Sequence, residues 1–160
     1  MASCRSGGLN RVAIALGSNL GDRRGHIVWA AEQISSHLSD GRLSSLIETA
    51  PVDVPDTQPP YLNAAFVGLT IADPVALLQI LLRLERARGR QRPSFHAPRT
   101  LDLDLILHGD NVIETAALAL PHPRFRERLF VLAPLAELVP DWVDPVTGKT
   151  MAALLAQARP

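Results

Sequence analysis

Four leucines at alternate positions, from residue 101 to residue 107, constrain the fold more than any other stretch of this chain. A period of two is typical of a β-strand, because successive side chains point to opposite faces of a sheet. The leucines therefore face a core, while Thr100, Asp102, Asp104 and Ile106 share the opposite face. Aspartate is depleted in strands, and two like charges on one face repel each other. We therefore expect something positively charged against that face.

The two aspartates of this strand allow two interpretations. Alternate residues lie about 7 Å apart along a strand, so the carboxylates could converge on one or two hard cations. They could equally line a solvated face and pair with a basic side chain such as Arg99, because short motifs often occur without function. The preceding stretch, residues 89–97, is basic and poor in structure-forming residues. A carboxylate pair beside such a loop suits a magnesium-bound polyphosphate, since carboxylates hold the metal and guanidinium groups hold the phosphates.

Length, charge and cysteine content limit the possible folds and partners. With 160 residues, the chain is long enough for one domain with a full core; we expect a flexible tail over residues 1–10 and a single domain over residues 11–160. Its 16 basic and 16 acidic residues cancel, which argues against a general nucleic-acid or membrane surface. The single cysteine excludes a disulfide framework and a cysteine-based metal site. Because the sequence shows no signal peptide or membrane span, we expect a cytoplasmic protein.

The order of the segments predicts a β-α-β-β-α-β arrangement. Strands are expected over residues 11–16, 43–49, 61–71 and 101–107, with a short one at 112–113; helices are expected over residues 24–38 and 74–88, then through residue 138, and over residues 151–159 after a hairpin at 143–150. Asp73 followed by Pro74 indicates a helix start, because aspartate caps the first amides and proline suits the first helical position. This order is that of ferredoxin-like α+β folds. We therefore expect helices on one face of an antiparallel sheet, and loops and ligand on the other.

Three further segments carry side chains suited to a ligand. Tyr61 offers a ring for stacking and Asn63, on the same strand face, offers a donor and an acceptor to a planar heterocycle; a surface tyrosine and a strand-edge asparagine are the alternative. Residues 120–130 hold three arginines, and His122 between two prolines, which indicates either a solvated basic face or a rigid binding site. Glu85 could bind ligand hydroxyls or pair with an arginine one turn later.

In the order and spacing of these segments, the sequence resembles the 6-hydroxymethyl-7,8-dihydropterin pyrophosphokinases. These are folate-pathway enzymes that transfer a diphosphate from ATP to a pterin alcohol. The matching stretches are residues 15–21, 61–65, 89–90, 98–104 and 121–122, in the family's order and close to its spacing. The string Arg-Thr-Leu-Asp-Leu-Asp is the most specific of them. The resemblance implies an ATP-dependent diphosphotransferase that uses two Mg²⁺ ions. We expect a monomer whose partners are ATP and the pterin, with no nucleic acid and no membrane.

The resemblance also implies roles for individual residues. Two aspartates would hold the magnesium ions around the triphosphate, and two aromatic rings would sandwich the pterin. The implied catalytic residues are Arg90, Arg92, Arg99, Asp102 and Asp104, of which Asp102 and Asp104 bind metal; the implied ATP-binding residues are Glu85, Arg90, Arg99, His122 and Arg128; the implied pterin-binding residues are Thr49, Val52, Tyr61, Asn63 and Phe130. The loop between Arg92 and Arg99 is slightly shorter than in the best-known members and lacks their tryptophan.

Two other functions stay open on the residues alone. A metal-dependent phosphohydrolase would use the same aspartate pair with water as the nucleophile, and would form product without any pterin. A ferredoxin-like regulatory module would bind a nucleotide and yield no AMP; the fold itself hosts many functions and does not separate these cases. The possible stacking pair of Tyr61 and Phe130, together with Asn63, favours the diphosphotransferase.

Overall fold

The structure of the protein, a computed structural model, describes residues 8–50, 59–89 and 100–158. In chain order its elements are β1 (Asn10–Ser18), α1 (Arg23–Ser35), β2 (Ser39–Leu43), β3 (Ile47–Thr49), β4 (Tyr61–Thr70), α2 (Pro74–Ala87), β5 (Asp102–His108), β6 (Ile113–Glu114), β7 (Ala119–Leu120), the 3-10 turn η1 (Phe125–Glu127), α3 (Leu129–Leu138) and α4 (Met151–Gln157). From β1 to β5 they follow the expected order, with β2 and β3 together in place of the second strand.

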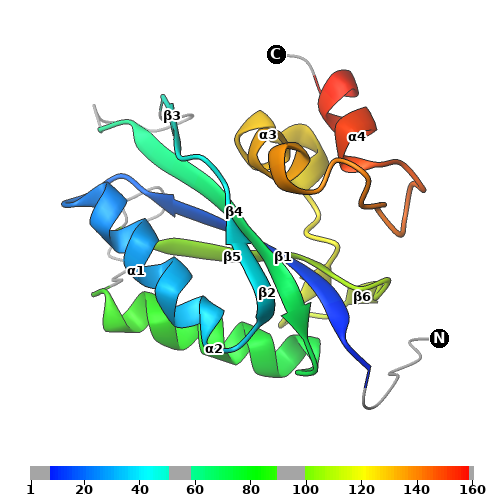
Figure 1. Cartoon of the computed structure of the whole chain (residues 1–160), viewed down its shortest axis with the longest axis horizontal. Helices are drawn as coiled ribbons and strands as arrows, with labels where there is room; N and C mark the ends of the chain where they lie inside the picture. The colour runs from blue at the N-terminus through cyan, green and yellow to red at the C-terminus, as the bar shows by residue number, and fades with distance from the viewer. Residues whose placement is uncertain (1–7, 51–58, 90–99, 159–160) are drawn as a thin grey trace.

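The main sheet is antiparallel, and β4 and β1 are its inner strands. Its order is β2-β4-β1-β5, and β3 also pairs with β4. β1 pairs with β4 along its whole length and with β5 over most of it. The arrangement confirms the predicted ferredoxin-like α+β fold. Figure 1 shows α1 and α2 on one side of this sheet and α3 and α4 on the other.

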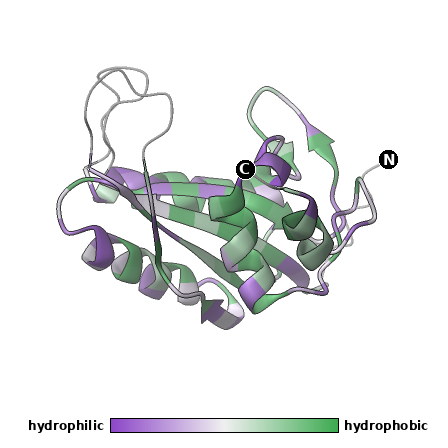
Figure 2. Cartoon of the chain, turned by 90° about the horizontal axis from the view of Figure 1, so that it is seen from above, coloured by the Kyte–Doolittle hydropathy of each residue, from purple (hydrophilic) through white to green (hydrophobic). Residues whose placement is uncertain are grey.

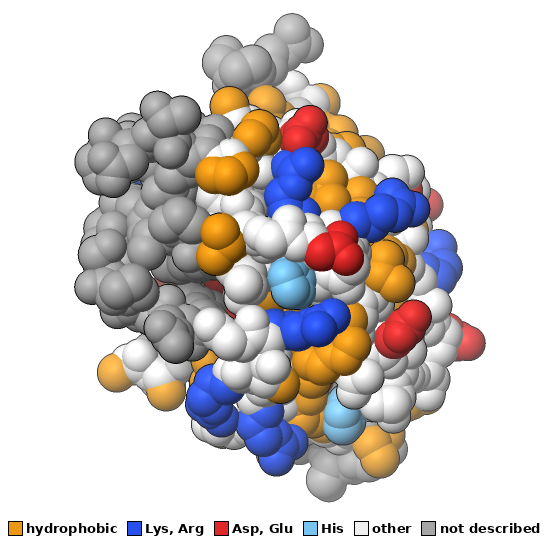
Figure 3. Space-filling model, turned by 90° about the vertical axis from the view of Figure 1, so that its left-hand side faces the viewer, with side chains coloured by type: hydrophobic (Ala, Val, Ile, Leu, Met, Phe, Trp, Pro, Cys, Tyr) orange, Lys and Arg blue, Asp and Glu red, His pale blue; other side chains and the backbone are white. Residues whose placement is uncertain are grey.

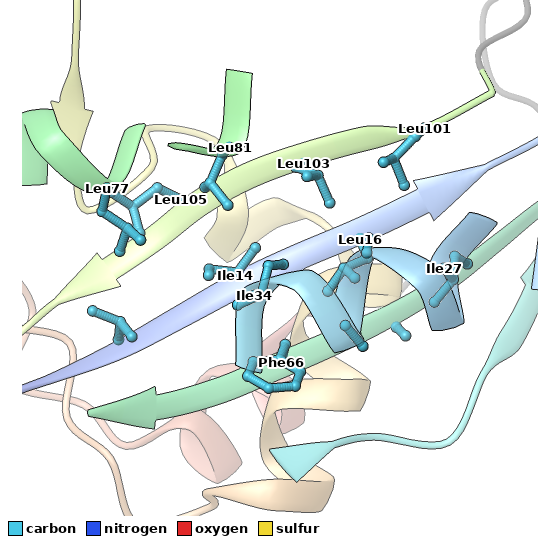
Figure 4. Packing of buried hydrophobic residues seen from close by; sticks show 14 of the residues in the cluster. Ile14, Leu16, Ile27, Ile34, Phe66, Leu77, Leu81, Leu101, Leu103 and Leu105 are labelled. Carbon is cyan, nitrogen blue, oxygen red and sulfur yellow. The ribbon is translucent and has the colours of Figure 1, made fainter. Parts of the chain in front are cut away.

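One core lies between the sheet and the helices α1 and α2. Its buried side chains include Ile14, Leu16, Ile27, Ile34, Phe66, Leu77, Leu81, Leu103 and Leu105. Figure 4 shows these side chains meeting between the strands and the two helices. α2 begins as expected, since the side chain of Asp73 accepts the N–H of Ala76 at 2.8 Å and Pro74 is the first helical residue. The N-terminal half of the chain therefore builds a complete helix layer.

A bulge in β5 changes the expected alternation at its far end. Leu101, Leu103 and Leu105 lie in the core beneath α1 and α2 as predicted. The register then shifts, because Ala13 is opposite Leu107 while the next residue of β1 is opposite Leu105. One extra residue in a strand reverses the face of those that follow. Leu107 is buried as expected but on the opposite face, so its predicted face was wrong.

The opposite face of the sheet is not left to loops, as had been expected. α3 packs on β4, and α4 packs on α3. A second core there includes Ala13, Ala65, Val67, Ile106, Leu107, Phe125, Val131, Leu132, Leu135, Met151 and Leu154. α3 is apolar around most of its circumference, so it must be buried on more than one side. Figure 2 shows long hydrophobic stretches along the central strands, which lie between the two helix layers. Only part of this face remains for a site.

The second expected strand, residues 43–49, is divided into β2 and β3 by Ser44. This serine is 4% exposed, and its N–H donates to the carbonyl oxygen of Ala65 at 2.9 Å. In return the N–H of Ala65 donates to Ser44 Oγ at 2.8 Å. A side-chain hydroxyl thus takes the place of a ladder carbonyl, which lets the strand direction change without leaving a buried N–H unsatisfied.

The predicted hairpin over residues 143–150 is present in minimal form, as one antiparallel bridge, and its turn is built around a buried carboxylate. Residues 143–150 form a single bridge between Val143 and Thr150. Between them Asp144, fully buried, accepts hydrogen bonds from Arg126 Nε at 2.6 Å and from Arg126 Nη2 at 2.9 Å. Thr147 Oγ1 and the N–H of Val146 also donate to this carboxylate. The segment folds back because a buried carboxylate needs these donors.

Three further expectations concern the ends and the small elements. The short strand expected at residues 112–113 is β6, shifted by one residue, and it pairs with β7, which was not predicted. Most of the expected tail lies outside the described residues, and a single domain over residues 11–160 stays a prediction. In the three described ranges, no helix is both long enough and apolar enough to cross a membrane.

Acid should selectively remove the stability that Asp144 contributes. Burial opposes ionisation of this side chain, but its hydrogen bonds from Arg126, Thr147 and Val146 outweigh that effect and lower the pKa from 3.8 to about 2. A group whose pKa is lower in the folded state stabilises the fold at pH values above its pKa in the unfolded state. This stabilisation is lost as the pH falls toward the pKa of the folded state. We expect Asp144→Asn to lower the free energy of unfolding by about 2 kcal/mol at neutral pH.

Urea unfolding of the wild type and of Asp144→Asn, repeated at several pH values, measures this effect. The difference in the free energy of unfolding between the two proteins should have its full size above about pH 5 and should shrink as the pH falls toward about 2. A difference of constant size across that range would contradict the ion pair.

Candidate active site

The strand register places two polar side chains on one face of the sheet, on either side of a glycine. On β1, Gly17 is opposite Asn63 of β4 and also opposite Asp102 of β5. Directly opposed residues of antiparallel strands point to the same face. We call Asn63, Gly17 and Asp102 the polar row. Neighbouring strands are about 4.8 Å apart, so the backbones at the two ends of the row are about 10 Å apart.

A second row beside it places the other aspartate. Ala15 is opposite both Ala65 and Asp104, so Asp104 points to the same face as Asp102. Both aspartates are half-buried. Ala65 belongs to the core beneath α3. The polar row therefore lies at the end of the sheet where the cover of α3 stops. Figure 3 faces this end of the molecule and shows basic, acidic and histidine side chains interspersed with hydrophobic ones.

Three of the expected pterin-binding residues lie together at the start of β4. Thr49 is opposite Tyr61, and Asn63 Nδ2 donates to Thr49 Oγ1 at 2.7 Å. A Cβ atom at Gly17 would lie 3.3 Å from Asn63 Oδ1 and 3.7 Å from Tyr61 Cδ1. The amide and the tyrosine ring thus border a space that exists because residue 17 has no side chain. The sequence did not predict the place of Gly17 between Asn63 and Asp102, because only the strand pairing reveals its two neighbours.

The segment that leads into α3 brings His122, Arg128 and Phe130 toward this end. The N–H of His122 donates to the carbonyl oxygen of Ile106 on β5 at 3.0 Å, which fixes the start of the segment. Phe130, in the first turn of α3, packs against the second core, and the Arg128 guanidinium lies 5.7 Å from the centroid of its ring. α3 also contacts β3, the strand that carries Thr49.

The electrostatic surroundings of His122 link it to both the arginine and the aspartate. Burial is the largest cause that lowers its pKa, Arg128 lowers it further, and Asp102 acts in the opposite direction. Nδ1 accepts the N–H of Arg124 at 3.2 Å. A neutral ring that accepts at Nδ1 carries its proton at Nε2. His122 can therefore donate one hydrogen bond to an anion without bearing a charge.

Glu85 lies behind the aspartate strand and not on its polar face. Its carboxylate is 2% exposed, and Oε2 accepts the N–H of Leu103 at 2.8 Å. Leu103 stands between the two aspartates, on the outer strand of the sheet. The buried carboxylate therefore fixes the part of β5 that presents Asp102 and Asp104. The expected contact of Glu85 with ATP stays a prediction.

The carboxylates fit a cation that arrives with its own oxygen ligands. In the described parts of the chain, no group of three or more histidine, cysteine, aspartate or glutamate side chains could hold a metal ion. Mg²⁺ is usually bound by one or two carboxylates, with substrate phosphates and water as the other ligands. Asp102 and Asp104 on one strand face meet that requirement.

The structure thus gathers most of the sequence-predicted residues at one end of the sheet. Thr49, Tyr61 and Asn63 lie on β3 and β4, Asp102 and Asp104 on β5, and His122, Arg128 and Phe130 on the segment that enters α3. The remaining candidates, Val52, Arg90, Arg92 and Arg99, lie outside the described residues, and their roles stay predictions.

Comparison with known families and curated proteins gives consistent results. The profile of the family described as 7,8-dihydro-6-hydroxymethylpterin-pyrophosphokinase matches residues 13–140. A 2-amino-4-hydroxy-6-hydroxymethyldihydropteridine pyrophosphokinase of Synechocystis is 40% identical over 146 residues, covering 90% of this chain and 74% of the relative. The enzyme of the same name from Bacillus subtilis is 44% identical over 133 residues, covering 81% and 79%.

Some similar proteins are much longer than this chain. A mitochondrial folate synthesis bifunctional protein of Arabidopsis thaliana is 43% identical over 136 residues, which are 84% of this chain and 24% of that protein. A crystal structure of Plasmodium falciparum HPPK-DHPS superposes with a TM-score of 0.74 at 14% identity, over 98% of this chain and 47% of that one. At that identity the likeness shows the fold alone.

The titration of His122 tests the arrangement of charges around it. Because Arg128 lowers the pKa of this imidazole and Asp102 raises it, we expect Arg128→Met to raise the pKa and Asp102→Asn to lower it further. NMR titration of the ring protons measures both shifts. Arg42→Met, at an exposed arginine that bonds the carbonyl of Leu138, serves as the control and should leave the titration unchanged. Shifts of the same sign in the two site variants would contradict the placement.

Proposed function

The chain belongs to the 7,8-dihydro-6-hydroxymethylpterin-pyrophosphokinase family, and we propose that it carries out the family's reaction at the polar row of Asn63, Gly17 and Asp102. It is an ATP-dependent diphosphotransferase of folate biosynthesis. The diphosphate of ATP is transferred to the hydroxymethyl group of 6-hydroxymethyl-7,8-dihydropterin, and AMP is released. The observation that carries the location is the register, which puts the amide of Asn63 at one end of the row and the carboxylate of Asp102 at the other.

At one end of the row, we propose that the pterin ring binds between β4 and α3. Asn63 would hydrogen-bond the edge of the heterocycle, while Tyr61 and Phe130 would contact its faces. Thr49 supports this role because it accepts a hydrogen bond from the Asn63 amide and so fixes which way the amide points. Val52 completes the proposed set. Burial of Asn63 to 6% exposure favours a fixed hydrogen-bonding edge over a mobile surface amide.

At the other end, we propose that Asp102 and Asp104 hold two Mg²⁺ ions with the triphosphate of ATP. The bound ions would neutralise the phosphates and make the attacking hydroxyl more acidic. The proposed ATP contacts are Glu85, Arg90, Arg99, His122 and Arg128, and the proposed catalytic groups are Arg90, Arg92, Arg99, Asp102 and Asp104. The donor set of two carboxylates on one strand face supports the metal assignment, since Mg²⁺ prefers such oxygen ligands.

The transfer itself requires alignment and charge neutralisation more than covalent help from the protein. The pterin hydroxymethyl oxygen forms a bond to the β-phosphorus, the bond from this phosphorus to the bridging oxygen of the α-phosphate breaks, and AMP leaves with the electron pair. The hydroxyl proton passes to solvent. The Arg128 guanidinium and the Nε2–H of His122 would stabilise charge on the phosphates, and they do so best where water is excluded.

Family membership favours this reaction over the two alternatives. A phosphohydrolase needs no residues for a planar heterocycle, whereas Thr49, Tyr61 and Asn63 form a contiguous group. Gly17 of β1 separates this group from Asp102 on the same sheet. A regulatory module needs no paired carboxylates on one face. We also propose that the protein acts as a cytoplasmic monomer without nucleic acid. The balanced charge supports the absence of a nucleic-acid partner.

Neutralising either aspartate should stop the reaction without unfolding the protein. We expect Asp102→Asn and Asp104→Asn to reduce AMP formation roughly a hundredfold or more, because each removes a charged ligand of the metal ions. Asp110→Asn, at an exposed aspartate in the turn after β5, is the matched control and should keep full activity. Turnover at the wild-type rate in either site variant would overturn the metal assignment.

A methyl group at residue 17 should weaken the binding of the pterin and leave the binding of the nucleotide unchanged. In Gly17→Ala the new Cβ would lie 3.3 Å from Asn63 Oδ1, so the amide must shift. We expect about tenfold weaker pterin binding, since overpacking of this kind typically costs 1–3 kcal/mol. Isothermal calorimetry with each ligand measures the effect, and Tyr61→Ala should change pterin binding in the same direction.

Gly8→Ala is the control for that experiment, because nothing lies within 4 Å of a Cβ atom built there. If Gly17→Ala weakened ATP binding and left pterin binding unchanged, the pterin site would have to be moved away from the polar row.

A further inference from the structure

One arginine of the cluster after Pro121 has no part in the proposed reaction. Arg128 lies beside Phe130, and the N–H of Arg124 donates to His122, but Arg126 is directed toward the C-terminal segment. The residue that receives it, Asp144, lies beyond residue 140, where the family match ends. Arg126 itself lies within the matched residues, so the pair joins the matched part of the chain to the segment that follows it.

The contact between Arg126 and Asp144 is a two-point ion pair with a buried acceptor. Arg126 donates through Nε and Nη2 to the two carboxylate oxygens, at 2.6 and 2.9 Å. Thr147 Oγ1 donates to Oδ2 at 2.7 Å, and the N–H of Val146 donates to Oδ1 at 3.0 Å. Asp144 is fully buried. Because two nitrogens of the planar guanidinium bind two oxygens of a fixed carboxylate, the pair defines the orientation of the Arg126 side chain as well as its distance from Asp144.

Arg126 is the middle residue of η1, which links His122 to Arg128. The N–H of Phe125 donates to the carbonyl oxygen of His122 at 3.4 Å, and the N–H of Arg128 donates to the carbonyl oxygen of Phe125 at 3.2 Å. Phe125 is fully buried, and the Arg126 guanidinium lies 4.8 Å from its ring centroid. His122 precedes this short turn and Arg128 follows it. The position of the turn therefore sets the separation between the His122 imidazole and the Arg128 guanidinium.

The start of α3 depends on the same turn. The carbonyl oxygen of Arg128 accepts the N–H groups of Val131 and Leu132, both at 3.0 Å. No side chain caps this helix, whose N-cap residue is Arg128 itself. In the described structure the first turn of α3, with Phe130, is thus fixed by η1 on one side and by the second core on the other.

We propose that Asp144 is a positioning residue of the diphosphotransfer reaction, which acts through Arg126 and η1 to hold His122 and Arg128 at the separation that the ATP phosphates require. The C-terminal segment, residues 141–158, is then part of the working site and not only a cover for the second core. The inference rests on the proposed function, because it takes the ATP-binding role of His122 and Arg128 from there.

The test is a steady-state comparison of Asp144→Asn with a variant that weakens the same segment by a different route. Leu154→Ala removes a buried side chain of α4 from the second core and leaves the carboxylate of Asp144 intact. Both are assayed at a temperature where circular dichroism shows the full folded signal. We expect Asp144→Asn to raise the KM for ATP about tenfold or more, with the KM for the pterin nearly unchanged, since small misplacements of binding groups have effects of this size.

Leu154→Ala should leave both KM values near those of the wild type, and Asp144→Glu, which keeps the charge, should recover part of the ATP affinity. The NMR titration of His122 should change in Asp144→Asn and not in Leu154→Ala. If Asp144→Asn does not fold, Thr147→Val, which removes one donor to the carboxylate, should show the same KM pattern to a smaller degree.

Equal KM values for ATP in Asp144→Asn and Leu154→Ala, with an unchanged titration of His122, would overturn the proposal and leave Asp144 a purely stabilising residue. This result differs from failure of the proposed function itself. In that case the wild type would form no AMP in the presence of pterin, and no variant would need to be compared.

Discussion

The antiparallel pairing of β1 with both β4 and β5 is the constraint on which the rest of this structure depends. Because β1 lies between the two strands, Gly17 is opposite Asn63 on one side and Asp102 on the other. A slip of one residue in either pairing would turn one of these polar side chains to the opposite face of the sheet. The burial of Ile14 and Leu16 beneath α1, and of Ala13 beneath α3, resists such a slip. The hydrophobic cores therefore also determine the chemistry of the polar row.

The second helix layer sets the limits of the site. Two cores on opposite faces of one sheet leave little exposed strand surface, and α3 covers the part of its face that is lined by Ala65, Val67 and Ile106. The remaining part is the end where β1 stops and β4 and β5 begin. The segment that enters α3 reaches this end with His122 and Phe130, and Asp144 holds its middle through Arg126. Packing energy and ligand geometry thus depend on the same few residues.

Features governed by local sequence could be predicted, and features governed by contacts between distant segments could not. The alternating leucines, the Asp73 cap and the order of strands and helices were predictable because each depends on neighbouring residues. The bulge at the end of β5, the division of the second strand by Ser44 and the cover of α3 over the sheet each depend on a distant partner. The same holds in the site. The aspartate pair was visible as a pattern, whereas the position of Gly17 between Asn63 and Asp102 emerges only from the strand pairing.

The most direct test of the account is the formation of AMP from Mg-ATP, measured with and without 6-hydroxymethyl-7,8-dihydropterin and with an EDTA control. The proposed arrangement requires both ligands, because the pterin supplies the nucleophile and the aspartate-bound metal ions neutralise the phosphates. It predicts AMP only when pterin and Mg²⁺ are both present. Release of AMP or phosphate without pterin would indicate hydrolysis by water. ATP binding by the folded protein with no AMP under any condition would contradict the assignment of the polar row as a catalytic site.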